Sequence, residues 1–184
     1  MKGVVFNLLQ QVVVDSYGED VWDDLLDAAG AHGAYTSLGS YPDAELESLV
    51  AAACAKLSLP RVEVLRWFGQ KAMPLLAKAY PDFFAGHSTA RTFVAGVNSI
   101  IHAEVRKLYP GAACPHFNIR EADGTLTMDY ASSRRLCALA QGFVEGAGAL
   151  YCEEVDFRHL ACVEHGDDGC RFEVVWPAAV ARAA

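Results

Sequence analysis

The sequence lacks a long apolar segment, a glycine-rich phosphate-binding loop and a serine-nucleophile motif. Without about 20 consecutive apolar residues, a membrane-spanning helix is not expected. Without the loop and the nucleophile motif, nucleotide binding and serine-dependent hydrolysis have no support. Basic residues are also few, since 15 Lys and Arg stand against 23 Asp and Glu, for a net charge of −8. So acidic a surface repels phosphate backbones, and we expect neither a membrane nor a nucleic acid as partner.

Apolar residues behind Lys2 superficially resemble a secretion signal. Asn7, Gln10 and Gln11 interrupt them, and no convincing small-residue cleavage site follows. We therefore expect an amphipathic helix at this end and a cytoplasmic protein. In a reducing compartment the six cysteines are core thiols or metal ligands rather than disulfides. Cys54, Cys114 and Cys152 are assigned to the core.

The spacing of apolar residues along the chain changes after about two thirds of its length. Apolar residues recur at helical spacing over 5–13, 21–29, 43–56, 62–80 (interrupted by Pro74) and 92–108. Beyond them, strands over 117–120 and 126–130 flank the hairpin signal Asp123-Gly124, followed by a helix over 134–149 and strands over 150–157 and 170–176. The pattern predicts an α+β fold with a helical subdomain over 1–60 and, over 61–184, a subdomain of helices and an antiparallel sheet.

One histidine lies beside the apolar stripe of the 92–108 helix. His102 is about 60° from Val105 on a helical wheel. A neutral imidazole at an apolar face is what haem iron requires. A buried histidine with a satisfied hydrogen bond is the more common occurrence, so His102 alone does not identify a haem site.

A second element follows a predicted strand and opens a predicted helix. Tyr130, Ser132 and Arg134 alternate along the chain, so their side chains face one way if the stretch is extended. Two hydroxyls and a guanidinium suit a carboxylate, such as a haem propionate. The alternative is an ordinary strand-to-helix junction with Ser132 as the N-cap.

Together these elements resemble the H-NOX (haem-nitric oxide/oxygen binding) family, which includes the sensor domain of soluble guanylate cyclase. The resemblance covers essentially the whole chain, as one domain over 1–184. It rests on Met1-Lys2-Gly3, Tyr17-Gly18, 81–86, His102, Pro115, the Tyr130/Ser132/Arg134 trio and 142–146. It implies haem b between the two subdomains, with His102 on the iron, the trio on the propionates and Pro115 pressing on the porphyrin.

The same resemblance bears on which gas is bound. Oxygen-binding members carry a distal tyrosine where this chain has Leu139, and the supporting positions match Leu9 and Ala72. Val5 and Phe143 complete an apolar pocket, in which nitric oxide and carbon monoxide bind without a hydrogen-bond donor. If the alignment were shifted, Tyr80 or Tyr151 would instead supply a hydroxyl in this pocket. The resemblance implies a ferrous nitric oxide sensor rather than an enzyme, acting in trans on a histidine kinase or a cyclic-di-GMP enzyme.

A second metal site is indicated near the C-terminus. His159, Cys162 and Cys170 lie close in sequence, and Cys137 on the preceding helix can fold over them. One imidazole and three thiolates form a tetrahedral zinc set, although the spacing alone also fits core thiols, and His165 is a spare ligand. Some H-NOX members carry a structural zinc with this order of ligands, and all four positions match.

Two rival functions remain open from the residues. The first is a zinc or thiol redox sensor, which signals by oxidation of Cys137, Cys162 or Cys170. The second is an enzyme that uses Cys114 as nucleophile and His116 as base. That pair has no evident orienting group or oxyanion hole, which argues against it.

Overall fold

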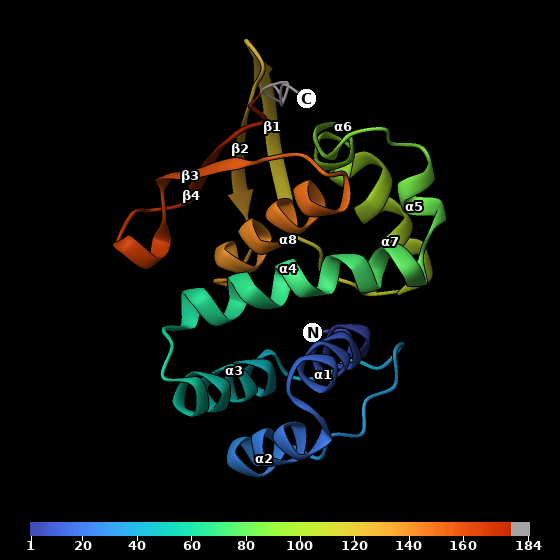
Figure 1. Ribbon diagram of the computed structural model, residues 1–184, viewed down its shortest axis with the longest axis vertical. Coiled ribbons are helices and arrows are strands. Elements are labelled where there is room, and N and C mark those ends of the chain that lie inside the picture. Colours follow the sequence, from blue (N-terminus) through green and yellow to red (C-terminus); the bar gives the residue numbers. More distant parts are fainter. Residues whose placement is uncertain (178–184) are drawn as a thin grey trace, which may run out of the picture.

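A long central helix divides the chain into two layers in the computed structural model, which describes residues 1–177 (Figure 1). Helices α1 (Gly3–Tyr17), α2 (Glu19–Ala29) and α3 (Asp43–Leu57) lie on one side of α4 (Arg61–Ala79). Helix α8 (Cys137–Leu150) and the β-sheet lie on the other. Within residues 1–177, no helix combines the length and apolarity that a bilayer crossing needs. The predicted α+β fold is confirmed.

Each layer has its own apolar core. The first core is built from α1, α2, α3 and one face of α4, where residues such as Phe6, Leu49 and Leu65 are at most 1% exposed. Helical spacing of apolar residues places them on this face, which is why the four helices were predictable. The second core lies between α8 and the sheet and includes Met128 and Phe172.

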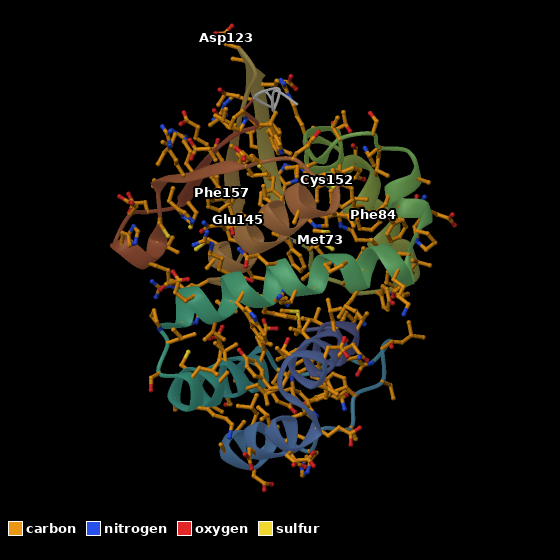
Figure 2. The ribbon with its side chains drawn as sticks, viewed as in Figure 1. Met73, Phe84, Asp123, Glu145, Cys152 and Phe157 are labelled. Atoms are coloured by element: carbon orange, nitrogen blue, oxygen red, sulfur yellow. The ribbon has the colours of Figure 1, made fainter. Side chains whose placement is uncertain are left out.

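The sheet has four antiparallel strands in the order β1-β2-β4-β3. They are β1 (His116–Ala122), β2 (Thr125–Ala131), β3 (Asp156–Ala161) and β4 (Cys170–Val175). Strands β1 and β2 form the predicted hairpin, whose Asp123 and Gly124 both have positive φ, of 49° and 82°, as a two-residue turn of this hand requires. Figure 2 shows Asp123 at the far tip of the molecule.

Several predicted boundaries are wrong. The 92–108 helix is three pieces: α6 (Ala90–Ala95), a π-helical segment η1 (Val97–Ile101) and α7 (His102–Leu108). The break falls at Gly96, a poor helix former whose N–H bonds to the carbonyls of both Thr92 and Phe93. A short helix α5 (Asp82–Ala85) lies in the preceding turn. Pro74, by contrast, does not interrupt α4, since packing on both faces outweighs the lost backbone hydrogen bond.

The last third also departs from its prediction. Helix α8 begins at Cys137 rather than 134, because local hydrogen bonds occupy the chain from Ser132 to Arg134. The strand predicted over 150–157 is wrong: α8 continues to Leu150, and the chain turns at Cys152, where φ is 57°. Strand β3 therefore begins only at Asp156, and the 3₁₀ turn η2 (Val163–His165) follows it.

Helices α4 and α8 approach each other through glycines. A Cβ atom on Gly69 would lie 2.6 Å from the Leu139 carbonyl oxygen, and one on Gly142 would lie 3.0 Å from the Cα of Gly69 and overlap the Arg66 carbonyl. Beside this crossing, Glu145 of α8 accepts hydrogen bonds from Arg66 Nε (2.7 Å) and Gln70 Nε2 (2.7 Å) of α4. The two helices are therefore in backbone contact, with an ion pair at their margin.

Replacing Gly142 by alanine should push α4 and α8 apart. Overpacking of this kind costs roughly 1–3 kcal/mol of unfolding free energy, which urea denaturation followed by circular dichroism will measure. Gly86→Ala is the matched control, because nothing lies within 4 Å of its Cβ position and its φ is −81°, so its change should stay within about 0.5 kcal/mol. Equal stabilities for the two variants would contradict the close approach.

Candidate functional site

A cavity of about 320 Å³ lies where the two layers meet. Its walls come from both cores: from α1, α4 and α8 on one side, and from α7, the Ala112–Pro115 segment, β1 and β2 on the other. The lining is mainly apolar and includes Leu8, Leu76, Ile101, Val105 and Phe117. Such a cavity, with a few polar groups, suits a largely apolar ligand with a polar edge.

His102, the first residue of α7, lies in the wall of this cavity. Its Nδ1 atom is buried and has no hydrogen-bond partner. Burial lowers the pKa of His102 to about 4, nearby Arg106 adds to this effect, and the Pro115 backbone carbonyl opposes it. The imidazole is therefore neutral at physiological pH and presents a free lone pair, as a metal ligand must.

The Pro115 segment faces the histidine. Pro115 lines the cavity as expected. Two residues later, Phe117 is buried and its ring lies nearly parallel to that of His102, at 24° and 6.1 Å between centroids. The histidine ring is thus packed against the start of β1.

Tyr130, Ser132 and Arg134 all border the same cavity. The strand alternation predicted for them is wrong, because β2 ends at Ala131 and the chain bends before Arg134. The bend is held by a hydrogen bond of 3.2 Å from Tyr130 Oη to the Arg134 carbonyl, and by one of 3.1 Å from the Arg134 N–H to Ser132 Oγ. The trio is therefore brought together by a turn rather than by an extended strand.

Arg134 also reaches across to the first layer. Its Nε donates to Asp43 Oδ2 at 2.8 Å, and its Nη1 donates to the Ala113 carbonyl at 2.7 Å. Burial alone would raise the pKa of the Asp43 carboxyl, but the Met1 ammonium and the Arg134 guanidinium hold it below its usual value. Arg135 instead points to the Val163 carbonyl and Glu164, so only Arg134 of the two borders the cavity.

The wall formed by α1 and α8 carries apolar side chains at its centre. Val5, Leu139 and Phe143, three of the residues expected around the gas, line the cavity. Leu9 and Ala72 do not reach it and are buried in the first core behind it. Leu8 and Met73 take their places in the lining, which helical spacing alone did not reveal.

Two hydroxyls in the cavity wall form a pair that the sequence analysis did not find. Tyr80 at the end of α4 and Tyr109 at the end of α7 are hydrogen-bonded to each other. Tyr109 lies seven residues after His102, about two helical turns away. This spacing places both side chains on one face of a helix and could have indicated Tyr109 from the sequence. Tyr151 is outside the lining and donates to the Phe84 carbonyl at 3.3 Å.

Three of the four predicted zinc ligands converge at a second place. The sulfur atoms of Cys137, Cys162 and Cys170 lie within 4.8 Å of one another, and all three residues are buried. The Cys137 and Cys162 sulfurs are 3.6 Å apart. Burial, and next the Cys162 sulfur, raises the pKa of the Cys137 thiol. This geometry suits either a metal or three protonated thiols.

His159 is not a member of this three-sulfur group. Its Nε2 is 2.9 Å from Gln141 Oε1, while its Nδ1 is buried without a hydrogen-bond partner. His165 is exposed and is also outside the group. Nδ1 of His102 and Nδ1 of His159 are thus the two histidine atoms left unsatisfied in the interior of residues 1–177.

The remaining cysteines do not form a nucleophilic site. Cys114 lines the cavity, where burial raises the pKa of its thiol, the opposite of what activation requires. His116, its supposed base, is exposed and lies outside the cavity lining. Cys54 is half-buried and Cys152 is exposed, so the core assignment of Cys152 is wrong.

Comparison with known proteins gives a consistent result. The profile of a family described as haem-NO-binding matches residues 2–159. The fold is similar to that of an H-NOX protein from S. oneidensis in its Fe(II)NO state, with a TM-score of 0.91, 32% identity and coverage of 97% of this chain and 100% of that one.

Two further structures are similar over comparable lengths. An H-NOX domain from Shewanella oneidensis in its Fe(II)CO state has a TM-score of 0.86 and 32% identity, covering 96% of this chain and 98% of that one. A mutant of an H-NOX protein from K. algicida, in its Fe(II) unliganded state, has a TM-score of 0.87 and 25% identity, covering 98% of both chains.

Proposed function

The chain belongs to the haem-NO-binding family, and from that premise we propose that it is a haem-based sensor of nitric oxide with His102 as the one protein ligand of ferrous iron. The observation that carries the proposal is the neutral, half-buried imidazole of His102 in the wall of an apolar cavity, with its buried Nδ1 unsatisfied. Haem supplies an iron with a free position at which a diatomic gas binds.

The polar end of the cavity supports the same proposal. Haem carries two carboxylates, and Tyr130, Ser132 and Arg134 offer two hydroxyls and a guanidinium at one edge of the cavity. Arg134 already binds the Asp43 carboxylate, which shows that its guanidinium is able to hold a group of this kind. Pro115 would then lie against the porphyrin from the His102 side.

Replacing His102 by glycine should remove the iron ligand, so the purified variant should lose haem and regain it when imidazole fills the vacated space. Absorbance spectra of the ferrous protein, with and without imidazole, measure both effects. His116→Gly is the matched control and should keep the unmodified spectrum, because His116 is exposed and outside the cavity lining. A His102→Gly protein with an unchanged ferrous spectrum and no added imidazole would contradict the assignment.

We further propose that the pocket selects nitric oxide and carbon monoxide over dioxygen. Bound dioxygen carries partial negative charge and needs a hydrogen-bond donor, whereas nitric oxide binds ferrous haem without one. The α8 wall offers Leu139 and Phe143, which have no donor. The hydroxyls of the lining belong to Tyr80 and Tyr109, which are bonded to each other at the ends of α4 and α7, and to Tyr130 and Ser132, which lie at the polar end of the cavity.

In air-saturated buffer the ferrous protein should form no stable oxygen complex, yet it should bind nitric oxide and carbon monoxide. Leu139→Tyr adds a hydroxyl, whose hydrogen bond to the partly charged ligand contributes about 1.5–3 kcal/mol, and this variant should form an observable oxygen complex. Leu139→Phe has nearly the same size without the hydroxyl and, like the unmodified protein, should form none. Stopped-flow absorbance detects the complexes, and an oxygen complex in the unmodified protein would refute the selectivity.

The output is the last part of the sensor proposal. We expect control of a separate histidine kinase or cyclic-di-GMP enzyme, as the family resemblance implies. The segment that carries His102 connects the cavity with the surface, because Ile100 and Leu108 are 44% and 47% exposed on its outer side while His102 faces the cavity. A displacement of His102 would therefore move exposed residues within two helical turns of it.

We also propose a structural zinc ion at Cys137, Cys162 and Cys170, with His159 as the fourth ligand. Three buried sulfurs within 4.8 Å of one another supply most of a tetrahedral set. The unsatisfied Nδ1 of His159, with its Nε2 held by Gln141, resembles the pattern in which a metal-bound histidine is oriented by a neighbour. Redox sensing by the same thiols is the alternative hypothesis.

If zinc is bound, elemental analysis of protein purified without chelator should find about one zinc ion per chain. Cys162→Ala should lose the metal and lower the unfolding temperature, because metal binding contributes to folding free energy. Cys54→Ala should change neither, since Cys54 lies on α3, in the other layer. An absence of zinc, with the three clustered thiols free in a thiol titration, would contradict the site.

A further inference from the structure

Asn98 is joined to Phe117 by two hydrogen bonds. Its Nδ2 donates to the Phe117 carbonyl, and its Oδ1 accepts from the Phe117 N–H at 3.2 Å. Asn98 lies in η1, one helical turn before His102, and its side chain is partly buried. A single side chain thus satisfies both backbone groups of one residue in another element.

This pairing occurs at an edge of the sheet. Strand β1 pairs with β2 alone, so the backbone groups on its other side have no neighbouring strand. The primary amide of Asn98 carries both a donor group and an acceptor group, and the next strand of a sheet would present the same two kinds of group to Phe117. Asn98 therefore fastens η1 to the edge of the sheet at one defined position.

Phe117, the residue that Asn98 holds, lies next to the proposed iron ligand His102. Phe117 lies against His102, with the rings at 24° and 6.1 Å, and on its other side it contacts Tyr130, with 5.5 Å between centroids. Pro115 is two residues before Phe117 and lines the cavity. The Asn98 contact thus sets how close the helix of His102 lies to the segment that carries Pro115.

From these contacts we infer that Asn98 is a positioning residue that restrains His102 and thereby sets the strength of the iron–imidazole bond. The inference rests on the proposed role of His102. In a π-helical segment the backbone ladder has an irregular register, so the side-chain contact to β1 carries the restraint. In haem-loaded protein, Asn98 would hold His102 back when a gas weakens the iron–imidazole bond. Without Asn98, His102 would be free to shift, and the bond would be retained more often.

Three variants test the inference in the haem-loaded protein. Asn98→Leu keeps the size and removes both hydrogen bonds, and Asn98→Asp keeps the acceptor but loses the donor. Ser99→Ala is the matched control, since Ser99 is in the same segment and its hydroxyl bonds only to Gly96, at 3.4 Å. Thermal unfolding establishes that each variant is folded, and Asn98→Asp serves if Asn98→Leu is not.

The first measurement is amide hydrogen exchange at Phe117 in the carbon monoxide complex. Loss of this hydrogen bond should accelerate exchange by about fivefold to tenfold in Asn98→Leu, and by less in Asn98→Asp, with no change in Ser99→Ala. The second is the iron–imidazole stretching band of the ferrous protein in resonance Raman spectra, which should shift only in the Asn98 variants. The third is the nitric oxide complex, in which Asn98→Leu should retain a larger fraction with His102 still bound.

The results separate the two levels of the proposal. A wild-type spectrum without an iron–imidazole band means that His102 is not the ligand, and the proposed function fails together with the inference. A wild-type band that is unchanged in folded Asn98→Leu or Asn98→Asp overturns the inference alone, whether or not Phe117 exchanges faster. A shifted band with faster exchange, absent in Ser99→Ala, supports it.

Discussion

The crossing of α4 and α8 is the contact on which the rest of the structure depends. Gly69 and Gly142 let the two backbones approach more closely than any side chain allows. Each helix contributes to both cores: α4 supplies Leu65 to the first and Met73 to the second, and α8 supplies Leu139 and Val144 in the same way. Since the cavity lies at the junction of the cores, its width is governed by this crossing.

The residues of the candidate site lie where regular secondary structure ends. His102 begins α7 directly after a π-helical segment, and the Tyr130/Ser132/Arg134 trio follows the end of β2. Irregular backbone and a sheet edge leave N–H and carbonyl groups unpaired, and here side chains satisfy them: Asn98 at Phe117, Ser132 at Arg134 and Arg134 at Ala113. The crossing of α4 and α8 therefore supports the site, while the irregular segments around it carry the candidate binding groups.

Amphipathic spacing and turn chemistry made much of this predictable. Phe6, Leu9 and Val13 recur at helical spacing, and Asp123-Gly124 requires a tight turn, so α1 and the β1–β2 hairpin could be expected. His102 and the trio were singled out from local patterns, and the resemblance then assigned these two distant elements to one haem site. Three features depend on long-range packing, which local sequence patterns do not report: the break at Gly96, the start of a strand at Asp156 and the position of His159. Tyr109 was missed because its partner Tyr80 is 29 residues away.

The pairing of Arg134 with Asp43 has a thermodynamic consequence for ligand uptake. A carboxylate already occupies the guanidinium, so a haem propionate bound at this edge, as proposed above, would displace an ion pair rather than create one. The released Asp43 keeps its contact with the Met1 ammonium at 2.7 Å, and it is not left as an isolated charge. Uptake at the proposed site would then be an exchange of one carboxylate for another, with little net gain in ionic energy and a weak dependence on salt. The affinity would come chiefly from the apolar walls and the iron, and the guanidinium would act mainly to select the orientation in which the ligand enters.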